Sequence, residues 1–418
     1  MALAETGAPL EDRRLGAPMK FNLENAEFKR DPLPTFAAMR GAGPVLPVRF
    51  SIVGKVWVTT THAATLAMVK DNTLFVQEGR HAGKSGPPGM QWWMPKSLLL
   101  MANNMLLKDE PDHRRLRHLV DRAFARRDVL AMRGSVEAIA DRILDDFEGR
   151  AEVDLASEFA RRLPLEVICD LLGLPAADRP QFAEWTGDAV ELKNALSLLR
   201  VSGVFDRMQG YIRGRIEAER CNPGAGLIAE LVRDEDGDRL DESELVSMVL
   251  LLLVAGFETT RHLIGDCVLM LETHPEQKAW LLADPAARME RAVEELARFT
   301  SPVQSTKPRF VAHDAVFLGQ KLRRGELIMG LVAAANADPA VFDAPDELRL
   351  DRFPNPHLVF SSGIHFCLGM QLARVEVQSA LSRLYARFRN LALVDPERIE
   401  WVPRLGVRGV KALPVSLN

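Results

Sequence analysis

The sequence predicts a mainly α-helical protein with small β-sheets, an α+β fold built as one large domain around a long central helix. Three observations favour this class. Apolar residues recur every three or four positions through most of residues 110–300, which is the period of an amphipathic helix. One stretch near the middle is apolar on nearly all sides, as expected for a buried helix. Short strand-like stretches occur before and after this helical region.

Composition excludes several classes of protein. The 418 residues are 47% hydrophobic, which is ample for a large core. With 53 basic and 57 acidic side chains, the net charge is −4, so nothing indicates a nucleic-acid partner or an anionic membrane. Four cysteines are too few for a disulfide scaffold in a chain of this length and fit a reducing compartment.

The chain also has no predicted membrane anchor. Its longest apolar run, Met248–Phe257, is shorter than the ~20 residues that a spanning helix needs. The first residues have no secretory-signal pattern. We therefore expect a soluble, cytoplasmic protein.

Taken in chain order, residues 1–20 are expected to be a loose leader, and residues 21–418 a single domain, because no linker rich in glycine and proline divides them. Short β-like pieces lie between residues 44 and 58. Residues 76–100 are punctuated by glycine and proline, which predicts a loop. That loop carries Trp92, Trp93 and Met94, which either pack on the core or line an apolar ligand pocket.

Helical periodicity defines the middle of the chain. Helices are expected at 111–127, 129–148, 155–172, 200–220, 241–272 and 368–388. Asp241 and Glu244 resemble a capping box at the start of the long helix. After Phe310 we expect short strands and turns, including 327–336, then an irregular stretch over 336–366, and strands again in the last 25 residues.

The sharpest local signal surrounds Cys367, in the run Phe360-Ser-Ser-Gly-Ile-His-Phe-Cys-Leu-Gly369. Its glycines predict a loop that places the cysteine just before a helix. Backbone N–H groups and the positive end of the helix dipole favour a thiolate there. Such a thiolate is a nucleophile or a metal ligand; the alternative is a buried structural cysteine.

This run resembles the haem-binding signature of the cytochrome P450 family, F-G-x-G-x-H-x-C-L-G. Phe360, Gly363, His365, Cys367 and Gly369 match it, whereas Ser361 stands where the family usually has glycine. The resemblance implies haem b (iron protoporphyrin IX) with Cys367 as the metal ligand. A thiolate ligand donates electron density to the iron and favours O–O cleavage.

Two further motifs follow the order of the family. Glu295 and Arg298 match its E-x-x-R, and Arg352 matches the arginine that completes a buried ion network with them. The run Ala255-Gly-Phe-Glu258-Thr259-Thr resembles the oxygen-activation motif of the central helix. There Ala255 leaves room for dioxygen, Thr259 bonds the carbonyl four residues back, and Glu258 relays protons. The alternative is a core threonine, with Glu258 paired to Arg261.

The resemblance also assigns cations to the two haem propionates. His113, Arg117, Arg309 and His365 occupy the corresponding positions. Arginine suits a carboxylate because its fork binds both oxygens. The other fate of each residue is ordinary surface charge.

The function implied is a haem-thiolate monooxygenase that inserts one oxygen atom from dioxygen into a hydrophobic substrate. Alternatives are a haem-binding sensor or carrier, and a peroxide-driven enzyme; both are disfavoured by the pair Glu258–Thr259. No flavin or nicotinamide motif is visible, so electrons must come from a ferredoxin or similar protein. We expect it to dock near Arg114 and Arg115.

Candidate substrate-contacting residues are mainly apolar. They are Trp92, Trp93, Met94, Leu251, Val254 and Val303. No cation is clearly directed into this set, so the substrate is expected to be uncharged.

Overall fold

The computed structural model describes residues 21–51, 53–86, 88, 103–125, 129–188, 195–233 and 239–417. The leader expected over residues 1–20 lies outside these ranges, and so do Trp92, Trp93 and Met94.

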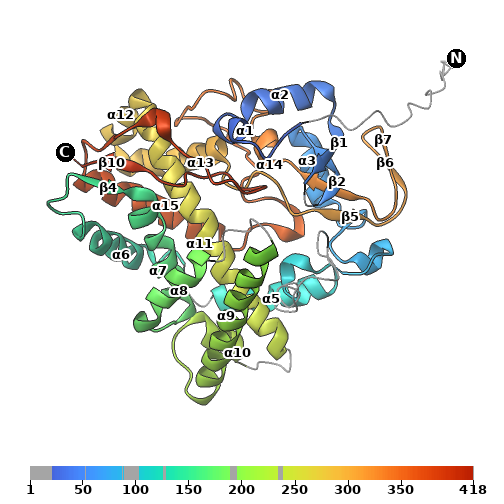
Figure 1. The fold of residues 1–418 in the computed structure, drawn as a ribbon, viewed down its shortest axis with the longest axis horizontal. Helices are drawn as coiled ribbons and strands as arrows, with labels where there is room; N and C mark the ends of the chain where they lie inside the picture. The colour runs from blue at the N-terminus through green and yellow to red at the C-terminus, as the bar shows by residue number, and fades with distance from the viewer. Residues whose placement is uncertain are drawn as a thin grey trace.

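A five-stranded sheet and three helices form one side of the molecule (Figure 1). In spatial order the strands are β1 (Val45–Phe50), β2 (Gly54–Thr59), β8 (Leu327–Gly330), β5 (Arg309–Val311) and β3 (Phe75–Val76). Only β2 and β8 pair in parallel. The helices are α1 (Ala26–Arg30), α2 (Leu33–Ala42) and α3 (His62–Lys70). The sequence analysis predicted β1 and β2 but missed these three helices.

Helices make up most of the rest. They are α5 (Asp112–Ala125), α6 (Arg133–Asp145), α7 (Arg162–Leu172), α8 (Arg179–Asp188), α9 (Ala195–Cys221), α10 (Leu227–Val232), α11 (Glu242–Thr273), α12 (Pro275–Ala283), α13 (Pro285–Thr300), α14 (Val332–Asn336) and α15 (Met370–Arg387). Short helical turns are η1 (Gly79–Ala82), η2 (Met105–Leu107), the π-helical η3 (Ala156–Ala160), η4 (Ala176–Asp178), η5 (Gly363–His365) and η6 (Pro396–Arg398). All six helices expected from periodicity are present, with ends shifted by a few residues.

Two smaller β-structures complete the fold. Strands β4 (Glu152–Asp154), β10 (Pro414–Ser416) and β9 (Ala392–Leu393) form a sheet, and β6 (Ala315–Phe317) pairs with β7 (Gln320–Leu322). One sequence prediction was wrong: residues 327–336 are strand only as far as Gly330, after which α14 begins. A short apolar run has the same periodicity in a buried strand and a buried helix, and the alanines here favour the helix.

The helix α11 crosses the middle of the molecule (Figure 1). It begins with the expected capping box: the Glu244 N–H donates to Asp241 Oδ1 at 2.7 Å, and the Asp241 N–H donates to Glu244 Oε2 at 3.0 Å. By length and composition α11 could cross a membrane, but 67% of its most apolar window is buried inside the protein. It therefore has the burial of a core helix in a soluble protein.

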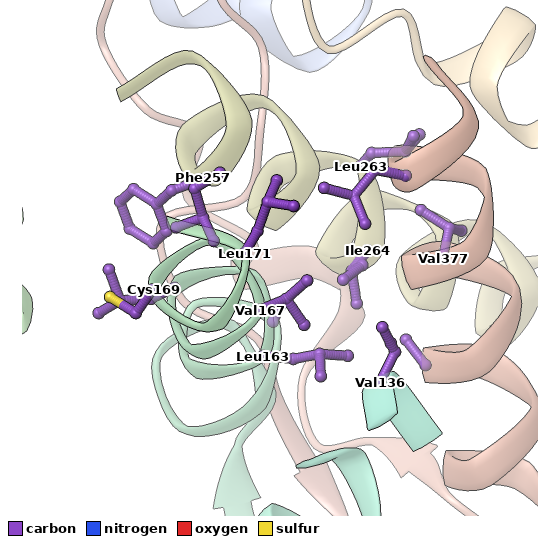
Figure 2. Close-up of a cluster of buried hydrophobic side chains, with 14 of the residues drawn as sticks. Val136, Leu163, Val167, Cys169, Leu171, Phe257, Leu263, Ile264 and Val377 are labelled. Carbon is purple, nitrogen blue, oxygen red and sulfur yellow. The ribbon is translucent and has the colours of Figure 1, made fainter. Parts of the chain in front are cut away.

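The packing of α7 and α15 on α11 fixes the position of the central helix. Figure 2 shows Leu163, Val167 and Leu171 of α7 meeting Leu263 and Ile264 of α11. The same cluster extends to α6 and α15 and excludes water from one side of α11 along much of its length. Burial on this scale is the main source of stability for the fold.

A buried carboxylate connects α13 to the irregular stretch before Cys367. Glu295 has no exposed side-chain area and accepts hydrogen bonds from Arg298 Nε at 2.7 Å and Arg352 Nε at 3.0 Å. It also accepts from the Arg349 N–H and from Asn355 Nδ2, each at 3.1 Å. The three residues expected to form a network therefore do lie together. Their buried charges are paired, which is the condition under which such charges are tolerated.

We predict that Glu295→Gln destabilises the protein by about 3–5 kcal/mol, because two buried arginines then lack their counter-charge. The measurement is chemical unfolding of the purified protein, with retention of bound haem as a second readout. Glu290→Gln is the matched control: Glu290 lies on the same helix but is exposed, so its replacement changes the free energy of unfolding by no more than about 0.5 kcal/mol. Equal stabilities of the two variants would contradict this role.

Candidate functional site

The loop that carries Cys367 is closed by backbone contacts. The Cys367 N–H donates to the Phe360 carbonyl at 2.9 Å, and Gly369 is the residue that precedes α15. Gly363 has a φ of 72°, and a Cβ there would lie 2.7 Å from the Val69 carbonyl of α3. Only glycine fits such a close approach without movement of α3. The loop is therefore held between α3 and the start of α15.

Ser361, which stands where the family usually has glycine, has a backbone conformation typical of glycine. Its φ is 61°, in the left-handed region that glycine adopts freely and most other residues avoid. The backbone keeps the turn that a glycine would make, at a conformational cost of about 1 kcal/mol or more. The serine therefore strains the loop without changing its path.

Cys367 faces a cavity that separates its loop from α11. The cavity holds about 1290 Å³ of space, counting its open mouth, and its walls are mainly apolar. Ten of the sequence-predicted residues line it: His113, Arg117, Leu251, Ala255, Thr259, Val303, Phe360, His365, Cys367 and Gly369. Among the described residues that were predicted, Val254, Glu258, Arg309 and Gly363 do not line it.

The Cys367 thiol experiences two opposing effects. Burial raises its pKa, whereas the Gly369 N–H and the charges of Arg117 and Arg374 lower it, and burial is the larger effect. The backbone N–H that the sequence analysis expected to favour the thiolate is thus present. In the protein without a bound metal, burial outweighs it and favours the neutral thiol. A metal ion bound to the sulfur would reverse this balance, because a coordinating thiol is deprotonated.

Four groups that carry or can carry positive charge gather at one side of the cavity. The rings of His113 and His365 lie 4.6 Å apart in an edge-to-face arrangement. Burial, with the charges of Arg309, His113 and Arg117, lowers the pKa of His365 to about 3. Burial also lowers the pKa of Arg309 to about 10 and that of His113. Arg117 is paired with Asp121 at 3.0 Å, whereas burial is the main effect on the pKa of the other three groups.

This cluster fits the two carboxylates of a porphyrin. His113 Nδ1 and Arg309 Nε are buried and have no hydrogen-bond partner among the described residues. The nearest carboxylate oxygen to His113 Nδ1, from Glu110, is 4.0 Å away, beyond hydrogen-bonding distance. Buried donors of this kind are costly unless a ligand satisfies them. The chemistry of the donors is thus that of an anion site beside Cys367.

On the opposite wall, α11 presents Ala255 and Thr259. Thr259 Oγ1 donates to the Ala255 carbonyl at 2.8 Å, and Thr260 Oγ1 donates to the Gly256 carbonyl at 3.0 Å. The back-bond expected for Thr259 is therefore present. Both threonines border the cavity, but only 3% of Thr260 is exposed. Thr259 is the more accessible hydroxyl.

Glu258 makes a different ion pair from the one considered in the sequence analysis. Its Oε1 accepts from Arg404 Nη1, 146 residues further along the chain, and not from Arg261 within its own helix. Arg404 lies in the loop between η6 and β10. The carboxylate is thus held behind the wall of the cavity, next to Thr259.

Sequence reasoning missed Arg404 and also Glu376. Glu376 lies on α15, borders the cavity, and is 2% exposed with Oε2 unpartnered among the described residues. Burial raises its pKa well above the usual range of a glutamate. A glutamate between Val375 and Val377, inside an otherwise apolar row of α15, is the signal that would have identified it.

Comparison with known proteins identifies the relatives of this chain. The family model described as "Cytochrome P450" matches residues 288–407. The chain is 38% identical to "Vitamin D(3) 25-hydroxylase" of Pseudonocardia autotrophica, over 100% of this chain and 99% of that one. It is 35% identical to "6-deoxyerythronolide B hydroxylase" of Saccharopolyspora erythraea, over 95% and 98%.

Solved structures agree with these relatives. The Bacillus subtilis cytochrome P450 PksS superimposes with a TM-score of 0.87 at 35% identity, covering 95% of this chain and 100% of that one. The myxobacterial cytochrome P450 CYP267B1, solved in complex with myristic acid, gives 0.85 at 33% identity, covering 95% and 98%.

Proposed function

The chain belongs to the cytochrome P450 family and is a haem-dependent monooxygenase, and we propose that it oxygenates a large hydrophobic small molecule with electrons from a separate protein. One observation carries the proposed arrangement of the site: Cys367 and Thr259 face each other across one mainly apolar cavity. The cluster of His113, Arg117, Arg309 and His365 lies beside it, and two of its buried atoms, His113 Nδ1 and Arg309 Nε, have no hydrogen-bond partner among the described residues.

The bound haem supplies the oxygen chemistry, and the chain supplies position and protons. In this proposal the Cys367 thiolate would bind the haem iron, and the four basic groups would hold the propionates. Phe360, Gly363 and Gly369 shape the loop around the sulfur. Glu295, Arg298 and Arg352 hold the segment that leads to it.

Proton delivery is assigned to the neighbouring pair on α11. The Thr259 hydroxyl borders the cavity and can hold a water beside Ala255. Glu258 precedes Thr259 on the same helix and is 8% exposed. Its carboxylate accepts from Arg404 and does not line the cavity. We assign Thr259 to hold the water and Glu258 to pass protons to it, with Arg404 keeping Glu258 in place.

The substrate is proposed to be large and hydrophobic. The cavity walls are mainly apolar, and burial of apolar surface is the main driving force for binding such molecules. Relatives are named for action on vitamin D(3) and 6-deoxyerythronolide B, and CYP267B1 was solved with myristic acid. Leu251, Val254 and Val303, with Trp92, Trp93 and Met94, are proposed to contact the substrate.

The electron donor is proposed to be an acidic ferredoxin that docks on α5. Arg117 Nη1 donates to the Phe366 carbonyl at 2.8 Å, so this helix packs on the Cys367 loop. Arg114 is 80% exposed and pairs with Glu110, which lies just before α5. Arg115, by contrast, is engaged by Glu244 of α11, which makes Arg114 the better docking residue. Arg126 and Arg127 lie outside the described residues.

A cytoplasmic location is part of the same proposal. The four cysteines Cys169, Cys221, Cys267 and Cys367 are all unpaired, as is usual in a reducing compartment. A ferredoxin partner would share that compartment.

The test of thiolate ligation is the absorption spectrum of the reduced protein with carbon monoxide. The wild type should give the strongly red-shifted Soret band of a thiolate-ligated haem, and Cys367→Ala should lose it, because no other cysteine lines the cavity in the described ranges. Cys169→Ala is the control, since Cys169 is buried and burial raises its pKa to about 12. Retention of the band in Cys367→Ala would exclude the assignment.

Thr259→Ala should uncouple the reaction. Without the hydroxyl the water is lost, protons are delivered unproductively, and hydrogen peroxide is released. Haem content and substrate binding should persist, while product formed per reductant consumed falls at least about tenfold. The quantities to measure are product, reductant and peroxide in the same reaction. Thr260→Ala serves as control and should be much milder; the opposite order would place the active hydroxyl one residue later.

Docking on α5 should depend on salt and on Arg114. Arg114→Glu should slow reduction by an acidic ferredoxin about tenfold at low ionic strength, and the difference should shrink as salt rises. Stopped-flow reduction measures this rate. Arg398→Glu is the matched control: Arg398 is 87% exposed, has one carboxylate neighbour, Asp395, and lies in η6. Equal slowing by both variants would show that overall charge, and not α5, controls the rate.

A further inference from the structure

Three large apolar side chains are exposed near α15 and the Cys367 loop. Their exposed fractions are 82% for Phe353, 63% for Leu130 and 38% for Phe366. Exposed apolar residues that are scattered singly over a surface need no explanation, whereas several on one surface indicate a binding site. The contacts of each residue therefore decide whether the three belong together.

Phe353 projects from the irregular segment onto the surface of α13. Its neighbour Arg352 is bonded to the buried Glu295, which holds the backbone at this point. The Phe353 ring lies 5.7 Å from the Arg291 guanidinium of α13, within range of a cation–π contact. Arg291 is exposed and forms no ion pair with any residue in the described part of the chain. An exposed aromatic ring and an unpaired cation thus stand side by side.

The next turn of α13 connects this pair to α15 and to the Cys367 loop. Glu294 lies on that turn and accepts from Arg374 Nε of α15 at 2.6 Å. The Arg374 guanidinium lies 5.1 Å from the ring of Phe360, which is the first residue of the loop. Phe353 is therefore separated from the loop by one row of polar side chains.

Phe366 belongs to the Cys367 loop itself. It directly precedes the cysteine, and its carbonyl accepts from Arg117 Nη1 of α5 at 2.8 Å. Arg114, the docking residue proposed on α5, lies three positions before Arg117 and so on the same side of that helix. The exposed Phe366 side chain therefore lies where α5 meets the loop.

Leu130 is connected to α15 through the start of α6. Its carbonyl accepts the Arg133 N–H at 3.3 Å, and Arg133 Nη2 donates to Gln378 Oε1 of α15 at 2.6 Å. Gln378 lies four residues after Arg374, hence on the same face of α15. That face meets α13 through Arg374 and α6 through Gln378. The three exposed apolar residues thus lie around one face of α15 and the loop before it.

We propose that Phe353, Phe366 and Leu130 are the apolar anchors of the surface that binds the electron donor, and that the donor presents an apolar side chain among its carboxylates. This inference rests on the proposed function and extends the docking surface from α5 across the Cys367 loop to α13. Interfaces are enriched in aromatic side chains and arginine, which are the groups found here. Electron-transfer complexes are small, burying less than about 1,200 Å² in total, so a few anchors determine their affinity.

The charges around the anchors fit an acidic partner better than a second copy of this chain. Arg114 and Arg291 are exposed cations, whereas the nearby carboxylates of Glu110 and Glu294 are already paired with arginines. A symmetric dimer would bring the same surface of two copies together, and so would bring like charges together. A donor with exposed carboxylates meets these cations instead.

The arginines and the apolar anchors act at different steps of binding. Charges attract the donor over a distance, so their effect on the association rate falls as salt rises. Apolar contacts form only in the bound complex and are not screened by salt, so they act on the dissociation rate. Replacement of Phe353 and replacement of Arg114 are therefore distinguishable by their salt dependence.

The test measures reduction of the ferric holoprotein by a plant-type ferredoxin at increasing ferredoxin concentration, in low and in moderate salt. Stopped-flow traces give the apparent dissociation constant and the limiting rate. Phe353→Ala should raise the dissociation constant about tenfold at both salt concentrations and change the limiting rate less than about twofold. Phe353→Leu, which keeps an apolar side chain, should recover most of the affinity. Val316→Ala, at a 70% exposed valine of β6, should change neither quantity.

Several results would overturn the proposal. These are an unchanged dissociation constant in Phe353→Ala, a loss of affinity that disappears as salt rises, or a wild type that the ferredoxin does not reduce. Sedimentation of the holoprotein tests a second copy as the occupant, and a dimer that Phe353→Ala converts to monomers would also overturn it. Failure of the proposed function has a different signature, which is absence of the thiolate-type carbon monoxide spectrum in the wild type after reduction by dithionite.

Discussion

The buried carboxylate of Glu295 is the interaction on which the geometry of the Cys367 loop depends. Through Arg298 it is linked to the Asn336 carbonyl, which accepts from Arg298 Nη1 at 2.8 Å. Asn336 Oδ1 in turn accepts the Leu358 N–H at 2.7 Å. Two residues later the Phe360 carbonyl accepts the Cys367 N–H. These hydrogen bonds hold an irregular segment of about thirty residues that has few strand or helix bonds of its own.

The rest of the site follows from the placement of α11 opposite that loop. Apolar packing against α7 and α15 fixes the helix on one side, and the cavity occupies the other. On the Cys367 side, His113 Nδ1 and Arg309 Nε are buried without a hydrogen-bond partner among the described residues, which lowers the stability of the protein without its cofactor. A dianionic haem removes that cost. The same arrangement therefore accounts both for the choice of ligand and for an expected gain in stability when it binds.

The sequence was sufficient for features that are local. The capping box at Asp241, the helix after Gly369 and the back-bond of Thr259 each depend on residues within one turn of each other. The partner of Glu258 was not predictable in this way, because Arg404 reaches α11 only after the C-terminal loop folds back on it. Helices α1–α3 were missed since each is short and its apolar residues serve the neighbouring sheet, where tertiary burial and not periodicity decides the conformation. The error at 327–336 has the same origin.

The position of Arg404 depends in turn on a buried lysine at the far end of the sequence. Lys29 Nζ donates to the carbonyls of Arg404 at 2.8 Å and Val407 at 2.6 Å, and to Gln304 Oε1 at 3.1 Å. Burial and the charge of Arg408 lower its pKa to about 8, but its three donors are all used. These bonds join α1, the segment before Lys307 and the loop that carries Arg404. The N-terminal helix therefore holds the loop whose Arg404 pairs with Glu258, although none of its residues lines the cavity. The partner of the proposed proton-relay acid is thus positioned from the other end of the chain, and a change at Lys29 would reach Glu258 through Arg404.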